Sequence, residues 1–266
     1  MLADPDVDAV YVPLPNELHK PWTLAAAEAR KHVLCEKPLA LDTAEAEDMA
    51  DYCKRHGVLL REAFMWRHQP RSAALRRMVA DGLIGDLRLV RSSFSFAIAP
   101  GDWRLDPARG GGALWDVGCY GVSTARFFTG SEPSEVIGRA HFGPSGVDLS
   151  LTAQLTFPGG VLGLIDCSFE QPFRCVYELV GTKGAITVPL AYLPPLWPSA
   201  KLKRDGRGDR TLRFAGRDQY AAMFDDFARC VAAGNGPSDV AEDGVDQMRV
   251  LDRVLKAARS ACPIIT

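Results

Sequence analysis

The residues with the clearest chemical potential lie in one Gly-rich segment. Residues 110–120 read GGGALWDVGCY, which places Asp116 and Tyr120 four positions apart. Residues at this spacing share one face of a helix, so a carboxylate and a phenol would point the same way. The ordinary interpretation is a glycine turn before a packed helix with a hydrogen-bonded tyrosine. A catalytic interpretation needs a cation nearby, because a phenol is a poor base at neutral pH.

A lysine that could supply this cation follows a predicted strand. Lys37 stands between Glu36 and Pro38, and this Glu-Lys-Pro segment directly follows the predicted strand at residues 32–35. Open α/β sheets bind ligands at the carboxyl ends of their strands. A solvated loop lysine is the more frequent case. If Lys37 reaches Tyr120, we expect its charge to lower the pKa of the phenol, so that the pair can move a substrate proton. Asp116 would orient the substrate and balance the lysine charge.

The elements that must position these residues begin as alternating strands and helices. Strands are predicted at residues 8–12, at 32–35 and from residue 58. One helix is predicted at residues 19–29, and a second runs from a capping box of Asp42 and Glu45 to a terminal Gly57. This order is typical of a parallel sheet with right-handed crossovers. The G-x-G-x-x-G turn that holds a dinucleotide pyrophosphate does not occur in the sequence.

After residue 87 the pattern changes to a period of two. Apolar and polar residues alternate over residues 149–157, and strand-like runs occur at 87–98, 135–142, 161–169 and 173–180. These runs predict an open, mostly antiparallel sheet. Apolar residues on both faces of the 161–165 run favour a homo-oligomer that associates through this sheet. Residues 193–210 are expected to form a solvated loop, and helices are expected at 219–232 and 243–260.

Composition limits the class of protein. The 266 residues carry a net charge of −2 and no Lys/Arg-rich run, so we expect no nucleic-acid or membrane partner. No apolar stretch is long enough to cross a bilayer, and the acidic N-terminal segment does not look like a signal peptide. The seven cysteines are scattered without metal-ligand spacing. These features predict a cytoplasmic protein with reduced thiols and no metal site.

The order of four segments resembles the glucose–fructose oxidoreductase/inositol dehydrogenase (Gfo/Idh/MocA) oxidoreductases. The segments are PNELH at 15–19, EKP at 36–38, WRHQP at 66–70 and the Gly-rich segment at 110–120. The resemblance covers essentially the whole chain. Many members carry histidine where this chain has Tyr120. Tyrosine there resembles the subgroup with glucose–fructose oxidoreductase, dimeric dihydrodiol dehydrogenase and D-xylose dehydrogenase.

The resemblance implies an NAD- or NADP-dependent enzyme that transfers hydride to or from a carbinol or carbonyl carbon of a sugar, polyol or cyclic diol. It implies that Tyr120 is the acid/base, that Lys37 tunes it and contacts substrate, and that Asp116 positions substrate. The residues implied at the cofactor are Pro15, Asn16, His19, Glu36, Lys37, Trp66 and Arg67. Trp103 and Arg104 are further candidates for the substrate pocket. The glycines are expected to let the backbone pass close to the bound ligands.

The same resemblance predicts an α/β fold in two parts. Residues 1–62 would form the C-terminal half of a Rossmann domain without its Gly-rich turn, and residues 63–266 an α+β domain for substrate binding and oligomerisation. Family members have roughly another half-domain before this point, so the chain is expected to be truncated and to bind nicotinamide nucleotide weakly or not at all. Two alternatives stay open, a catalytically inactive binding or regulatory protein on this fold and a Schiff-base enzyme that uses Lys37.

Overall fold

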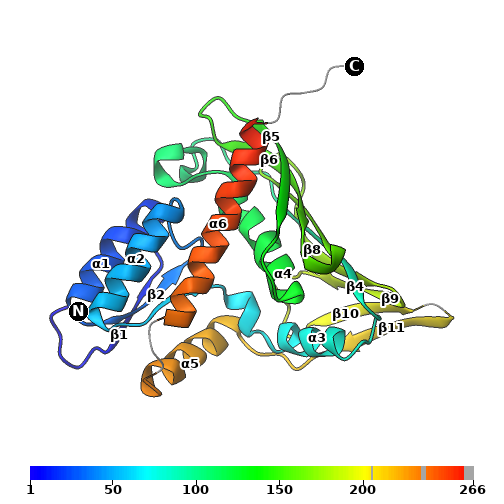
Figure 1. Cartoon of the computed structure of the whole chain (residues 1–266), viewed down its shortest axis with the longest axis horizontal. Coiled ribbons are helices and arrows are strands. Elements are labelled where there is room, and N and C mark those ends of the chain that lie inside the picture. The colour runs from blue at the N-terminus through cyan, green and yellow to red at the C-terminus, as the bar shows by residue number, and fades with distance from the viewer. Residues whose placement is uncertain (205, 235–237, 261–266) are drawn as a thin grey trace.

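The computed structural model describes residues 1–204, 206–234 and 238–260. Two sheets lie on opposite sides of the long helix α6 (Ser238–Ser260), as Figure 1 shows. The α6 residues expected from their helical spacing, Val245, Met248, Leu251 and Val254, are buried. The helix packs against β3 of the small sheet and β5 of the large one, so it joins the two halves of the molecule. Within the described residues, no helix combines the length and apolarity needed to cross a membrane.

The small sheet confirms the predicted parallel arrangement. Its strands are β1 (Ala9–Val12), β2 (His32–Glu36) and β3 (Leu60–Ala63), which pair in parallel in that order. Helices α1 (His19–Glu28) and α2 (Thr43–His56) connect them. The Asp42 carboxylate accepts from the backbone N–H of Glu45 at 2.8 Å, and Gly57 ends α2 with a φ of 67°. Both local signals in the sequence therefore act as predicted.

His19 joins the two loops that leave this sheet at its carboxyl edge. Its side chain has no exposed surface. Its Nδ1 lies 2.9 Å from the carbonyl oxygen of Pro38, and its Nε2 lies 2.8 Å from that of Leu14. The loop after β1 is thereby held beside the loop after β2, which carries Lys37.

The large sheet is mixed and mostly antiparallel, in the order β11-β10-β9-β8-β4-β7-β6-β5. Only the pairing of β4 with β7 is parallel among its described strands. The strands are β4 (Leu87–Ser95), β5 (Glu135–Phe142), β6 (Asp148–Thr156), β7 (Leu162–Ser168), β8 (Arg174–Gly181), β9 (Gly184–Pro189), β10 (Ser199–Arg204) and β11 (Arg207–Arg213). Helix α4 (Cys119–Thr129) packs on β4 and β7, and α5 (Gln219–Ala232) forms as expected.

The predicted solvated loop at residues 193–210 is wrong for residues 199–204 and 207–210. Strand β10 and most of β11 lie there and pair as an antiparallel hairpin. The run of lysines and arginines hides a period of two, since Ala200 and Leu202 are buried while Lys201 and Lys203 are exposed. Strand β9 and helix α3 (Pro70–Ala80) were also not predicted from the sequence.

A distant strand fixes the start of the segment that carries Asp116 and Tyr120. Residues Leu114–Gly118 form a π-helical turn before α4, rather than the ordinary helix that the spacing predicted. Asp148 at the start of β6 accepts from the backbone N–H of Leu114 at 2.7 Å. Gly112 makes room for this contact, because a Cβ there would lie 2.3 Å from Asp148 Oδ1.

The buried Asp148 carboxyl predicts a pH effect on stability. Burial raises its pKa to about 7, so the folded state retains this proton at a pH where the unfolded chain has lost it. The protonated Asp148 carboxyl stabilises the folded state fully below the pKa that this carboxyl has in the unfolded chain. This contribution is lost as the pH rises to about 7. Asp148→Asn keeps an oxygen that can accept from Leu114 but does not titrate. We expect its free energy of unfolding to rise by about 2 kcal/mol relative to that of wild type as the pH increases from ~5 to ~8.

Urea denaturation of both proteins across this pH range measures the difference. Asp148→Ala is the control, because it removes the acceptor and should be less stable than Asp148→Asn by about 1 kcal/mol at every pH. Parallel pH profiles for wild type and Asp148→Asn would contradict the prediction.

Candidate active site

Asp116 lies between two cations from distant parts of the chain. Lys37 Nζ, in the loop after β2, donates to the Asp116 carbonyl oxygen at 2.7 Å and lies 3.1 Å from Oδ1. Arg104 Nε, in the 3-10 turn Trp103–Leu105, lies 3.0 Å from Asp116 Oδ2. The Lys37 and Asp116 side chains are 14% and 15% exposed, so little water screens this pair. The predicted partnership of Lys37 and Asp116 is therefore present in the structure.

The pair keeps both groups charged at neutral pH. Burial by itself raises the pKa of Asp116, but Lys37 and Arg104 bring it below its usual value. Burial by itself lowers the pKa of Lys37, but the charges of Asp116 and its neighbours, with the hydrogen bond to Asp116, together outweigh this and raise it. A Schiff-base lysine needs a lowered pKa to supply a neutral amine. The environment of Lys37 is the opposite of what that alternative requires.

Tyr120 lies next to this pair, in the first turn of α4. Lys37 Nζ is 5.1 Å from the centroid of its ring, and Phe64, Phe94 and Tyr192 surround the ring with centroid distances of 5.5, 5.5 and 4.7 Å. The phenol donates to Met65 Sδ at 3.6 Å. Burial raises the pKa of Tyr120 well above its usual value. The expectation that Lys37 lowers this pKa is wrong, because the ammonium faces the ring and is paired with Asp116.

The glycines before Asp116 serve contacts within the protein. Gly110 has a φ of 72°, and a Cβ there would lie 2.5 Å from a methyl carbon of Leu41. A Cβ on Gly111 would lie 2.4 Å from the carbonyl oxygen of Arg104. Asn16 Nδ2 donates to the Gly110 carbonyl oxygen at 2.9 Å. The close neighbours that exclude side chains at these two positions are protein atoms. That the backbone here also passes close to bound ligands stays a prediction.

A hollow of about 300 Å³ lies over these groups. Lys37, Arg104, Asp116 and Tyr120 line it, together with the apolar residues Phe94, Phe96, Val117, Phe173 and Leu193. The ring of Trp103 lies under the Arg104 guanidinium, 4.7 Å from its central carbon, and so supports Arg104 from behind. The hollow thus presents two cations, a carboxylate and a phenol to a small molecule.

Comparisons with known proteins agree on one family. Residues 1–64 match the oxidoreductase family with an NAD-binding Rossmann fold, and residues 72–187 match the GFO/IDH/MocA C-terminal domain. D-xylose 1-dehydrogenase (NADP(+)) 2 of Haloferax volcanii is 37% identical over 99% of this chain and 82% of its own length. The chain belongs to the Gfo/Idh/MocA family of NAD(P)-dependent oxidoreductases.

Solved structures of this family share the fold closely. A 3-ketoreductase from Actinomadura kijaniata in complex with NADP and TDP-benzene superposes with a TM-score of 0.89 at 33% identity, covering 96% of this chain and 80% of that one. Aldose-aldose oxidoreductase from Caulobacter crescentus gives a TM-score of 0.88 at 32% identity, with 97% and 79% covered. The two-sheet architecture is therefore that of an established Gfo/Idh/MocA oxidoreductase.

The residues at the carboxyl edge of the small sheet fit the nicotinamide half of such a cofactor. Open α/β sheets hold dinucleotides at this edge, where the loop that carries Asn16 lies beside the end of β2, which carries Glu36. Glu36 accepts from the Tyr11 hydroxyl and from the backbone N–H of Lys37. Its carboxylate and the Lys37 ammonium provide an acceptor and a donor of the kind that ribose and carboxamide groups require. His19 is fully buried, so it would act by holding these loops.

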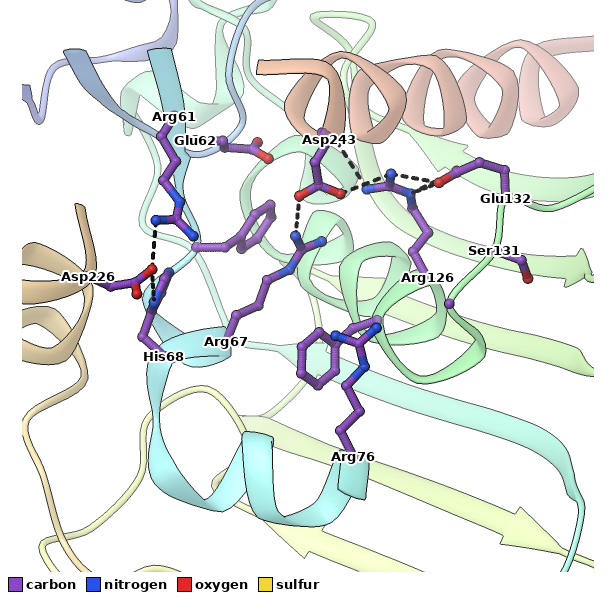
Figure 2. A pocket seen from close by; sticks show the side chains of 13 residues that line it. Arg61, Glu62, Arg67, His68, Arg76, Arg126, Ser131, Glu132, Asp226 and Asp243 are labelled. Atoms are coloured by element: carbon purple, nitrogen blue, oxygen red, sulfur yellow. Dashed lines mark hydrogen bonds and ion pairs between the residues drawn. The ribbon is translucent and has the colours of Figure 1, made fainter. Parts of the chain in front are cut away.

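Two residues implied at the cofactor, Trp66 and Arg67, do not line the hollow over Lys37. Trp66 has no exposed surface and packs edge-on against Phe127 and Tyr192 in the core. Arg67 lines a separate cavity of about 710 Å³. Figure 2 shows it pointing to Asp243, which also pairs with Arg126. The implied position of Trp66 and Arg67 near the nicotinamide stays a prediction. Their motif ties α4 to α6, since Arg67 also donates to Ser123 at 2.9 Å.

Sequence reasoning missed several neighbours of the Gfo/Idh/MocA site. Met65, Phe94 and Tyr192 enclose Tyr120, and Tyr220 at the start of α5 lies close enough to Glu36 and Lys37 to be influenced by their charges. None of these residues stands in a motif or at a fixed spacing from Tyr120. They come from the 3-10 turn Met65–His68, from β4, from the segment after β9 and from α5, so only tertiary packing brings them together.

The buried charge cluster predicts a large cost when its carboxylate is neutralised. Asp116→Asn leaves Lys37 and Arg104 as like charges without their anion. We expect the free energy of unfolding to fall by about 3 kcal/mol, measured by urea denaturation. The double variant Asp116→Asn/Arg104→Gln should recover part of this loss, because one of the two uncompensated cations is gone. Equal stability of wild type and Asp116→Asn would refute the cluster's role.

Proposed function

We propose that this chain transfers hydride between NAD(P) and a carbinol or carbonyl carbon of a sugar, polyol or cyclic diol, with Tyr120 as acid/base. The observation that carries the proposal is the convergence of Lys37, Asp116 and Tyr120 on one hollow. Relatives named for sugar oxidation or reduction support the substrate class. The nearby Arg104 would bind substrate oxygens together with Asp116.

Carbonyl reduction is the direction that the protonation states favour. A nicotinamide held at the carboxyl edge of the small sheet would supply the hydride, and the substrate oxygen would then need a proton. Since burial keeps Tyr120 protonated, its hydroxyl serves as the general acid. Its present acceptor, the Met65 thioether, is weak, so the O–H can turn to a substrate oxygen at little cost. Solvent returns the proton to the phenolate afterwards. Oxidation follows the same steps in reverse.

Lys37 and Asp116 act together on the same oxygen. The Lys37 ammonium carries the charge that stabilises the alkoxide as hydride arrives. The Asp116 carboxylate keeps the Lys37 ammonium protonated. The Asp116 carbonyl oxygen, 2.7 Å from Lys37 Nζ, fixes the position of the ammonium. The carboxylate also accepts from a neighbouring substrate hydroxyl, which orients the reacting carbon.

Replacing Tyr120 by Phe tests the assignment. The variant keeps the ring but loses the proton, so we expect kcat to fall about 10²–10⁴-fold while the KM for the cofactor barely changes. The neighbouring Tyr192 gives a matched control, because its hydroxyl hydrogen-bonds with the Ser92 and Thr124 hydroxyls. Tyr192→Phe should lower stability by about 1 kcal/mol and leave turnover intact.

Steady-state kinetics and melting curves of both variants decide the question. A Tyr120→Phe enzyme with normal kcat and a lowered Tm would remove Tyr120 from the mechanism. A catalytically inactive binding protein on this fold, the other class considered, would show no turnover in wild type with any sugar or diol.

We also propose that the chain forms a homo-oligomer through the outer face of the large sheet. Leu162 and Leu164 alternate with the helix-facing residues of β7, and Ile137 on β5 is 47% exposed.

The described cysteines are all free, which fits the reducing cytosol as the location that we propose for the protein.

Sedimentation velocity tests the assembly. We expect wild type to sediment as an oligomer and Leu164→Asp to dissociate it, because the new charge would be buried between subunits. Leu196→Asp, on a loop outside the sheet, is the control and should leave the assembly unchanged. A wild-type monomer at micromolar concentration would rule out this interface.

A further inference from the structure

The hollow over Lys37 has two chemically different walls. Lys37, Arg104 and Asp116 form a charged wall, and Phe94, Phe96, Phe173 and Leu193 form an apolar one. Tyr120 lies where the two walls meet, since it contacts Lys37 through its ring and packs against Phe94. A molecule that reacts at this point has one edge against charges and the other against hydrocarbon.

The apolar wall extends from Tyr120 to the mouth of the hollow. The Tyr120 and Phe94 ring centroids are 5.5 Å apart, and Phe173 stands edge-on to Phe94 at 6.4 Å. Phe173 is 53% exposed and Leu193 is 50% exposed. Both large apolar side chains line the hollow while half of their surface faces water. Covering them with apolar substrate atoms would contribute binding energy.

We propose that the hollow selects a cyclic substrate with vicinal oxygens on one edge and a deoxygenated opposite edge. A deoxysugar and a carbocyclic vicinal diol share this chemistry, and a fully hydroxylated ring of the same size lacks it. Phe173 and Leu193 are the residues that determine the preference. The inference rests on the proposed function and adds a substrate class to it.

The preference follows from the cost of stripping water from a hydroxyl. A hydroxyl placed against Phe94, Phe96 or Phe173 loses its hydrogen bonds to water, and the aromatic carbons offer none in return. On the charged wall the same hydroxyl has Lys37, Arg104 and Asp116 as partners. An apolar pocket discriminates against an added hydroxyl by up to about 10²-fold. Because the mouth is half open to water, we expect about tenfold.

Two matched substrate pairs test the proposal with the full chain and NADP⁺ or NAD⁺. One pair is 6-deoxy-D-glucose and D-glucose, and the other is trans-1,2-cyclohexanediol and myo-inositol. We expect kcat/KM to favour the deoxygenated member of at least one pair by about tenfold. The pair that shows the preference tells whether the enzyme accepts a sugar or a carbocycle.

Variants of the apolar wall locate the cause of the preference. Phe173→Gln and Leu193→Gln place an amide where a deoxygenated edge would pack, so each should reduce the ratio within the pair about threefold or more. Trp197→Gln is the control, because Trp197 is 74% exposed and does not line the hollow. It should leave the ratio unchanged. Melting curves confirm that all three variants are folded.

The outcomes separate this inference from the function beneath it. Turnover without preference in either pair overturns the inference and leaves the hydride-transfer proposal intact. A preference that Phe173→Gln and Leu193→Gln do not change, or that Trp197→Gln changes equally, also overturns it. No nicotinamide-linked turnover with any of the four compounds counts against the proposed function itself.

Discussion

The active-site region depends on one buried carboxylate, Asp116, held between Lys37 and Arg104. These residues come from the loop after β2, the π-helical turn before α4 and the 3-10 turn that contains Trp103. The cluster therefore joins the small sheet to the segment that leads into the large one. Because the charges are poorly screened, each fixes the position and protonation state of the others. Removing one would leave its partners both uncompensated and displaced.

The cluster also decides how acid–base chemistry can work here. A free lysine near Tyr120 would favour phenolate, but Asp116 compensates the charge of Lys37, and burial dominates the pKa of the phenol. In the proposed mechanism Tyr120 then acts as the proton donor, and Lys37 acts as a fixed positive charge. This division suits a carbonyl oxygen that receives a proton as hydride reaches its carbon. The same charge cluster forms one wall of the hollow, opposite the apolar wall that we propose selects a deoxygenated substrate edge.

Residues outside the hollow hold this arrangement in place. Asp148 fixes the start of the π-helical turn, and His19 fixes the two loops at the carboxyl edge of the small sheet. Arg67 ties α4 to α6 through Ser123 and Asp243. Asp148, Arg67 and the contact of His19 with Pro38 each join segments well apart in sequence, and each uses a side chain that is largely buried. Substituting these residues would affect catalysis by shifting the segments that carry the active-site side chains.

The sequence by itself determined the parallel strands, the caps at Asp42 and Gly57, the alternation in β6, the strand-like runs of β4, β5, β7 and β8, and the four segments that identified the family. These signals depend on neighbours a few residues away. It also named Lys37, Asp116 and Tyr120 as a group. The tertiary structure alone decided that Lys37 faces the Tyr120 ring, that Trp66 lies in the core and that a lysine-rich stretch forms β10. Burial and contacts between distant residues set these outcomes, and local spacing does not encode them.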